Sequence, residues 1–207
     1  MQIEFFGANC LRIKTKKTSI VFDDNLAELG GKTIANADDS LFNTNTDVIK
    51  TSNKAARTFY MPGDYEVGDI MLTGIAAQAH LDEKGTQKGT IYRGITPEFK
   101  FVVLGHIAPS LSEQQLESIG VVDILFVPVG GNGYTLDAVA SAKIAKQIGA
   151  KLVVPTHFKD SSIKYEVPQA PRDEFVKILG LEAKKVDGRS LKLKKSDIAE
   201  KAEIILF

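Results

Sequence analysis

The stretch VDILFVPVGGNGYTLDAVASAKIAKQIGAKLVVP, residues 122–155, decides the fold class of this chain. Asp123–Pro128 is an apolar run of strand length, and Thr135–Ile148 has the periodicity of an amphipathic helix that ends at Gly149. A second apolar run, Lys151–Pro155, follows directly. Strand, helix and strand at this spacing predict a βαβ unit with parallel strands, and therefore an α/β or α+β protein.

The residues before this unit favour short antiparallel strands. Ile3–Phe6, Cys10–Lys14 and Ser19–Phe22 are apolar runs separated by turn residues, and Glu66–Ala77 has the pattern of a hairpin. Between them, Asp24–Asp47 is rich in Asn, Asp, Gly and Thr, which predicts a long loop.

Two more helices are expected on either side of the βαβ unit. Ser112 stands three residues before Gln115, the spacing of a capping box, and a last helix is expected near Arg172–Leu179. The sequence has no internal repeat and no linker-like segment, so residues 1–207 are predicted to form a single domain.

Composition narrows the choice of partners and compartment. The 26 Lys and Arg residues balance 26 Asp and Glu residues, so no net field would attract nucleic acid or an anionic membrane. No apolar run approaches the ~20 residues that span a bilayer, and the first residues lack the pattern of a signal peptide. Cys10 is the only cysteine, which rules out an intrachain disulfide. We therefore expect a cytoplasmic protein without nucleic-acid or membrane partners; the sequence does not specify an oligomeric state.

The chain has only three histidines, and each follows an apolar run. His80 follows Ile75–Ala77, His106 follows Val102–Gly105, and His157 follows Val153–Pro155. The ends of strands are where α/β folds place their functional sites. The three histidines either share one site or occupy three unrelated positions at strand ends.

A resemblance to a known family suggests a role for these three positions. Five segments occur in the order and spacing of family motifs: Gly7-Ala8-Asn9-Cys10, Ile20-Val21-Phe22-Asp23, Pro62-Gly63-Asp64-Tyr65-Glu66, Leu104-Gly105-His106 and Val154-Pro155-Thr156-His157-Phe158. Together with residues 122–131 they resemble the metallo-β-lactamase superfamily, in its ascorbate-lactonase-like branch of small bacterial metal-dependent hydrolases. The resemblance implies a four-layer αββα sandwich whose loops hold one or two metal ions at one edge.

The principal metal-binding motif of that family is missing here. The resemblance places the family's His-x-His-x-Asp-His directly after a strand, which would be Asp47–Lys50. In this chain Ser52, Lys54, Ala56 and Arg57 stand where three histidines and an aspartate would be. Lys and Arg have no free lone pair at neutral pH, Ala has no ligand atom, and a Ser hydroxyl binds zinc poorly.

The other ligand positions of the family are occupied by the three histidines. The resemblance aligns His80 and His157 with histidine ligands, and His106 with the aspartate that bridges two metal ions. A neutral imidazole offers one lone pair and cannot bridge, so a two-metal centre is not expected. Either the three imidazoles hold one Zn²⁺, or they are remnants and no cofactor binds. Asp23 is expected to support the metal loops without binding metal.

Two cations near the lost motif suggest what replaced the metal. If Lys54 or Arg57 faces the former site, its charge substitutes for a metal ion or creates a pocket for a small anion. Alternatively, both side chains extend into solvent, as is common for these residues. The sequence thus leaves two functions open. One is a hydrolase-like protein with a degenerate site, inactive or weakly active, that binds an anion or another small molecule. The other is a one-zinc hydrolase of an ester, lactone or phosphoester that uses His80, His106 and His157.

Overall fold

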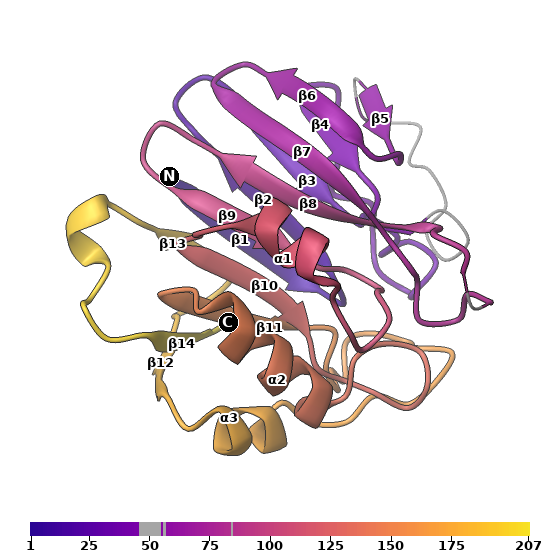
Figure 1. Cartoon of the computed structure of the whole chain (residues 1–207). Helices are drawn as coiled ribbons and strands as arrows, with labels where there is room; N and C mark the ends of the chain where they lie inside the picture. Colours follow the sequence, from indigo (N-terminus) through magenta and orange to yellow (C-terminus); the bar gives the residue numbers. More distant parts are fainter. Residues whose placement is uncertain (46–54, 56, 84) are drawn as a thin grey trace.

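Two β-sheets packed face to face form the body of the protein (Figure 1). The structure is a computed structural model, and it describes residues 1–45, 55, 57–83 and 85–207. The two sheets are each built from segments that are distant in the sequence, because strands near the C-terminus join both of them. The predicted sandwich of two mixed sheets is therefore confirmed.

The six-stranded sheet contains most of the N-terminal strands in the order β13-β1-β2-β3-β4-β5. Its strands are β1 (Gln2–Gly7), β2 (Cys10–Lys14), β3 (Ser19–Phe22), β4 (Asp39–Phe42), β5 (Arg57–Phe59) and β13 (Ser190–Lys192). The predicted antiparallel meander is β1, β2 and β3.

The sequence-based prediction was wrong for β4, which lies inside the segment expected to be a long loop. Leu41 and Phe42 are fully buried, and β4 pairs in parallel with β3, with Phe42 opposite Phe22. Only four residues form this strand, and Asn and Asp surround it. The pairing with β3 stabilises a strand whose own residues give too short a pattern to detect.

The eight-stranded sheet has the order β12-β14-β11-β10-β9-β8-β7-β6. Its strands are β6 (Gly63–Val67), β7 (Ile70–Ala77), β8 (Gly89–Ile95), β9 (Lys100–Val103), β10 (Ile124–Pro128), β11 (Leu152–Thr156), β12 (Glu182–Lys185) and β14 (Glu203–Leu206). Strands β6 to β9 are antiparallel, whereas β9, β10, β11, β14 and β12 run parallel. The predicted hairpin (β6–β7) and βαβ unit (β10–α2–β11) are both confirmed.

Three α-helices accompany the eight-stranded sheet: α1 (Glu113–Ile119), α2 (Ala138–Ile148) and α3 (Asp173–Leu179). A short 3₁₀ helix, η1 (Lys195–Asp197), lies near the C-terminus. Both hydrogen bonds of the capping box predicted at Ser112 are present. Helix α2 begins later than expected because the Asp137 side chain accepts a hydrogen bond from the backbone N–H of Ala140 and caps it there. None of the described helices is long and apolar enough to cross a membrane.

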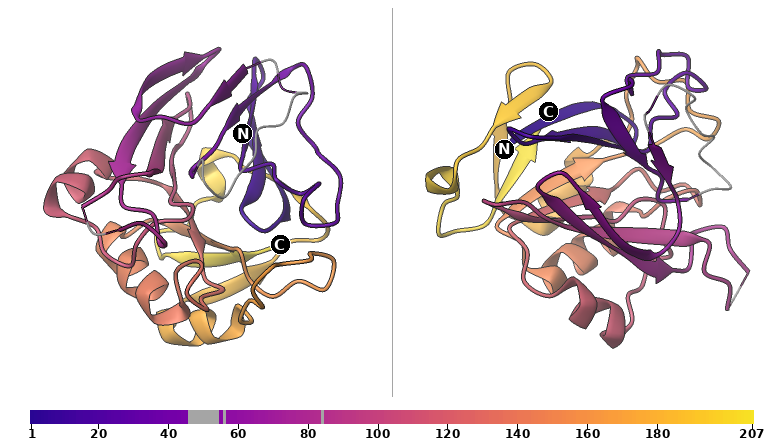
Figure 2. Two further views of the ribbon diagram at one scale, coloured as in Figure 1. Left: turned by 90° about the vertical axis from the view of Figure 1, so that its right-hand side faces the viewer. Right: turned by 90° about the horizontal axis from the view of Figure 1, so that it is seen from above.

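The layers outside the two sheets differ from each other (Figure 2). Helices α1, α2 and α3 lie on the outer side of the eight-stranded sheet, where Phe175 of α3 is buried. Among the described residues, the loop that connects β3 to β4 covers the outer side of the six-stranded sheet. Leu26 and Ala35 of this loop pack on Val21 and Leu41. In the part of the chain described, helices therefore cover the outer side of the eight-stranded sheet, whereas an apolar loop stands where the αββα arrangement would have its second helical layer.

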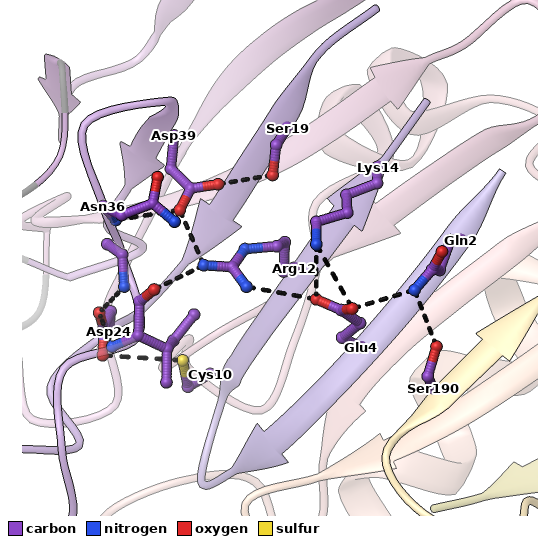
Figure 3. A network of polar contacts seen from close by, with 12 residues as sticks. Gln2, Glu4, Cys10, Arg12, Lys14, Ser19, Asp24, Asn36, Asp39 and Ser190 are labelled. Carbon is purple, nitrogen blue, oxygen red and sulfur yellow. Dashed lines mark hydrogen bonds and ion pairs between the residues drawn. The ribbon is translucent and has the colours of Figure 1, made fainter. Parts of the chain in front are cut away.

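A buried ion pair fastens this loop to the sheet (Figure 3). The Arg12 guanidinium on β2 donates to Asp39 at 2.8 Å and to Glu4 at 3.3 Å, and it also donates to the carbonyl oxygen of Ile34 in the loop. The Asp24 carboxylate accepts hydrogen bonds from the backbone N–H groups of Ile34 and Ala35, at 2.9 and 2.7 Å. The carboxylates pair with Nη1 and Nη2 of Arg12, which offsets the cost of burying the charges, whereas Arg12 Nε has no hydrogen-bond partner among the described residues.

Candidate functional site

The three histidines follow strand ends on the same side of the eight-stranded sheet. His106 and His157 follow β9 and β11, two parallel strands on either side of β10, and their ring centroids lie 4.8 Å apart. His80 follows β7, and its backbone N–H donates to the carbonyl oxygen of His106 at 3.2 Å. The structure thus brings His106 and His157 together at the ends of two parallel strands and places the His80 backbone beside His106. That all three rings can share one ligand or ion stays a prediction.

Each ring of the His106–His157 pair is anchored through Nδ1. The Nδ1 atom of His157 lies 3.1 Å from Oε1 of Gln169, and that of His106 lies 3.4 Å from the carbonyl oxygen of Tyr134. Both oxygens are acceptors, so each Nδ1 carries the proton and each Nε2 keeps its lone pair. Burial lowers the pKa of His106 to about 4 and that of His157 to about 3. The pair is therefore uncharged at neutral pH.

The backbone around His157 is held in an uncommon conformation. His157 has φ +47°, and its N–H donates to the carbonyl oxygen of Ala8 at 2.7 Å. The preceding residue, Thr156, donates from its hydroxyl to Oδ1 of Asn9 at 2.8 Å. Residues of the β1–β2 turn thus fix the end of β11, which explains how two sheets contribute to one site.

Asp23 supports this edge of the sandwich without contacting the histidines in any described interaction. It has φ +48°, and its carboxylate accepts hydrogen bonds from the backbone N–H and the hydroxyl of Thr44, both at 2.7 Å. Burial raises the pKa of Asp23 to about 7, against the opposite effect of the Thr44 hydrogen bonds. A Cβ on Gly105 would fall 2.0 Å from Oγ1 of Thr44, so Thr44 packs directly against the residue before His106.

A cavity of about 650 Å³ opens beside the histidine pair. The residues that line it include Asn45, Asp82, Glu83, Lys88, Tyr134 and Glu166. The Tyr134 ring is centred 5.4 Å from the ring of His106 and 6.1 Å from that of His157, so it links the cavity to the pair. Burial raises the pKa of the Tyr134 hydroxyl, and the nearby carboxylates of Glu166 and Glu28 raise it further.

Sequence reasoning missed three residues of this site. Tyr134 follows the glycine-rich turn after β10, where its position gives a weak signal. Gln169 and Thr44 lie in segments without any recognisable motif. Their roles depend on contacts with His157 and Asp23 that the sequence does not reveal.

Residues 2–157 match the family model described as the beta-lactamase superfamily domain, which covers most of the chain. The chain belongs to the metallo-β-lactamase superfamily. A solved structure with this fold matches the chain over its whole length. A protein from Thermotoga maritima assigned as a Zn-dependent hydrolase of the metallo-β-lactamase superfamily is 23% identical, with a TM-score of 0.76, covering 100% of this chain and 98% of that one.

More distant metallo-β-lactamase folds also match. An isothiocyanate hydrolase from Delia radicum gut bacteria is 11% identical with a TM-score of 0.65, covering 94% of this chain and 100% of that one. A metallo hydrolase from the archaeon Ignicoccus hospitalis is 12% identical with a TM-score of 0.60, covering 93% of this chain and 99% of that one. At these identities the likeness shows the fold alone. No curated protein matches the chain in sequence.

The metal ions of metallo-β-lactamase hydrolases do not fit the residues described here. Among residues 1–45, 55, 57–83 and 85–207, no group of three or more His, Cys, Asp and Glu side chains is placed to hold a metal ion. His80 belongs to the cluster, but its buried Nδ1 has no hydrogen-bond partner in this part of the chain. No carboxylate joins the His106–His157 pair in any described contact.

The residues at the lost metallo-β-lactamase motif are only partly described. Ser52, Lys54 and Ala56 lie outside the described residues, as does the strand predicted at Asp47–Lys50. Arg57 begins β5 and is exposed. The idea that Lys54 or Arg57 replaces a metal ion or forms an anion pocket therefore stays a prediction.

Proposed function

We propose that this metallo-β-lactamase-fold, hydrolase-like protein has lost metal-dependent hydrolysis and uses its cavity to bind a small molecule. The observation that carries the proposal is the His106–His157 pair. The resemblance assigns His106 to the position of the carboxylate that bridges two metals, and here its ring packs 4.8 Å from that of His157. A neutral imidazole with Nδ1 engaged offers one remaining lone pair and cannot bridge two ions.

The sequence of the missing motif supports the same conclusion. Ser52, Lys54, Ala56 and Arg57 remove four strong ligands, and hydrolases of this kind need a metal to lower the pKa of water to about 7. Without that metal, His106 and His157 are left only as general bases for water, and their lowered pKa values of about 4 and about 3 make them weak ones. Loss of hydrolysis leaves the fold and the cavity intact, which is why we propose a binding function.

One observation favours a second candidate, the hydrolase with a single zinc ion. The two imidazoles are each anchored through Nδ1 to an oxygen, an arrangement that is common for histidines that ligate metals. His80 would have to supply the third nitrogen. The described side chains do not form such a group, so this candidate ranks second.

Metal content and turnover decide between the two. Protein purified without chelator or added metal should contain less than a stoichiometric amount of zinc. It should not hydrolyse generic lactone, ester or β-lactam substrates, with or without added Zn²⁺. Zinc-dependent turnover that disappears in His157→Ala would overturn the proposal and establish the one-zinc hydrolase.

A further inference from the structure

The cavity beside the histidine pair carries more negative than positive charge in its described lining. Asp82, Glu83 and Glu166 contribute three carboxylates, whereas Lys88 is the only cation among the described lining residues. Lys88 also has an interaction of its own. A concave surface lined by one sign of charge raises the local concentration of ligands of the opposite sign.

An aromatic ring forms part of the lining of this cavity. Tyr134 lines it, and the edge-on contact with His106 at 5.4 Å holds the ring in place. The face of a tyrosine ring attracts cations through its quadrupole, most strongly where water is excluded.

A polar atom without a partner lies next to the cavity along the chain. The Nδ1 atom of His80 is buried and has no hydrogen-bond partner among the described residues. The residues that follow it directly, Leu81 and Asp82, both line the cavity. The segment that follows His80 therefore forms part of the cavity wall, beside the histidine cluster.

We propose that this cavity binds a small organic cation, with its ammonium group against Tyr134 and between the carboxylates of Glu83 and Glu166. The inference rests on the proposed function, because it names the class of molecule that the cavity binds. It also differs from the anion expected if Lys54 or Arg57 were to face the site, so the two ligand classes can be compared directly.

Choline is a suitable probe, since 3,3-dimethylbutan-1-ol has the same shape without the charge. Binding of both, and of acetate as the anion, is measured by titration calorimetry and ligand-observed NMR at low ionic strength, because salt screens exposed carboxylates. Choline should bind about ten-fold more tightly than the neutral alcohol, the ratio that a cation–aromatic contact with nearby carboxylates supplies. Equal binding of the two, preferential binding of acetate, or no binding of choline would overturn the inference.

Two pairs of variants locate the interaction. Glu166→Gln should weaken choline binding about two- to five-fold, whereas Glu117→Gln, the same change at an exposed position on α1, should leave it unchanged. Tyr134→Phe should retain binding and Tyr134→Leu should lose most of it. If Glu117→Gln weakens binding as much as Glu166→Gln, the cation binds through net charge and not in this cavity.

The outcome is separable from the test of hydrolysis. Selective choline binding together with zinc-dependent turnover would refute the proposed loss of hydrolysis and leave the ligand class standing. Absence of turnover together with equal binding of choline and the neutral alcohol would refute only the ligand class.

Discussion

The rings of His106 and His157 pack 4.8 Å apart and nearly perpendicular, at 81°, and each is held by a different oxygen acceptor. This pair occupies the place where the resemblance expects a bridging carboxylate beside a histidine ligand. The contact is between two uncharged rings, because burial lowers both pKa values far below neutrality. The described contacts of the pair are therefore the packing of the two rings and the hydrogen bonds at their Nδ1 atoms.

Restoring the family motif should restore zinc binding. In the combined variant Ser52→His, Lys54→His, Ala56→Asp, Arg57→His and His106→Asp, added Zn²⁺ should raise the melting temperature, whereas that of the parent should not change. At a zinc concentration of a hundred times Kd, ligand linkage stabilises the folded state by about 2.7 kcal/mol. Calorimetric melts with and without zinc check this. An equal increase in the parent would show that its existing residues already form a metal site.

The pH dependence of stability should reveal two opposing contributions. The folded-state pKa values of His106 and His157, about 4 and about 3, lie below the unfolded value of about 6.5. Between these folded and unfolded pKa values, the unfolded state therefore binds more protons at the two histidines than the folded state does. The stability that the two neutral histidines contribute is lost as pH falls below about 6.5. Asp23 acts oppositely: its folded pKa of about 7 exceeds the unfolded value, so its contribution is lost as pH rises from about 3.9 to about 7.

Asp23→Asn should separate these contributions. Asn tolerates the positive φ of this position and can keep both Thr44 hydrogen bonds. We compare the free energy of unfolding of the variant with that of the parent at each pH. The difference should shift in favour of the variant by at least about 1.4 kcal/mol between pH 5 and pH 8, the equivalent of one pKa unit. Urea unfolding of metal-free protein at the two pH values measures this. Asp38→Asn, the same change at an exposed residue, serves as the control; a parallel shift there would contradict the assignment to Asp23.

Breaking the buried ion pair under the β3–β4 loop should be costly. Asp39→Ala leaves the buried Arg12 guanidinium without its 2.8 Å partner, which should lower the free energy of unfolding by about 3 kcal/mol. Lys14→Ala removes a more exposed partner of Glu4 and should cost less than about 1 kcal/mol. Denaturant titration of both variants tests the difference. Similar losses would mean that Arg12 does not depend on Asp39.

Gly105 should be intolerant of any side chain, for a reason beyond its backbone conformation. Gly105 and Gly149 have φ values of +61° and +67°, but a Cβ at Gly105 would meet Thr44 at 2.0 Å whereas one at Gly149 would meet nothing within 4 Å. Gly149→Ala should therefore cost about 1 kcal/mol from conformation alone. Gly105→Ala should cost at least about 2 kcal/mol more, because Thr44 must move. Equal thermal destabilisation would show that the Thr44 contact is unimportant.

The sequence by itself determined the features that depend on local pattern. Residues 122–155 predicted the β10–α2–β11 unit, since alternation between apolar runs and helical periodicity is a property of neighbouring residues. The positions of His106 and His157 after apolar runs placed both at strand ends, and parallel strands end at one edge. The absence of ligand residues at positions 52–57 was likewise visible in the residue types alone.

The tertiary structure decided what depends on contacts between distant segments. Strand β4 forms because β3 offers it a partner, and the outer side of the six-stranded sheet carries the loop because Leu26 and Ala35 find apolar residues there. The protonated nitrogen of His157 is set by Gln169, which no motif marks. Burial then fixes the charge of these groups, because the free energy of an ionised side chain depends on the residues that exclude water from it.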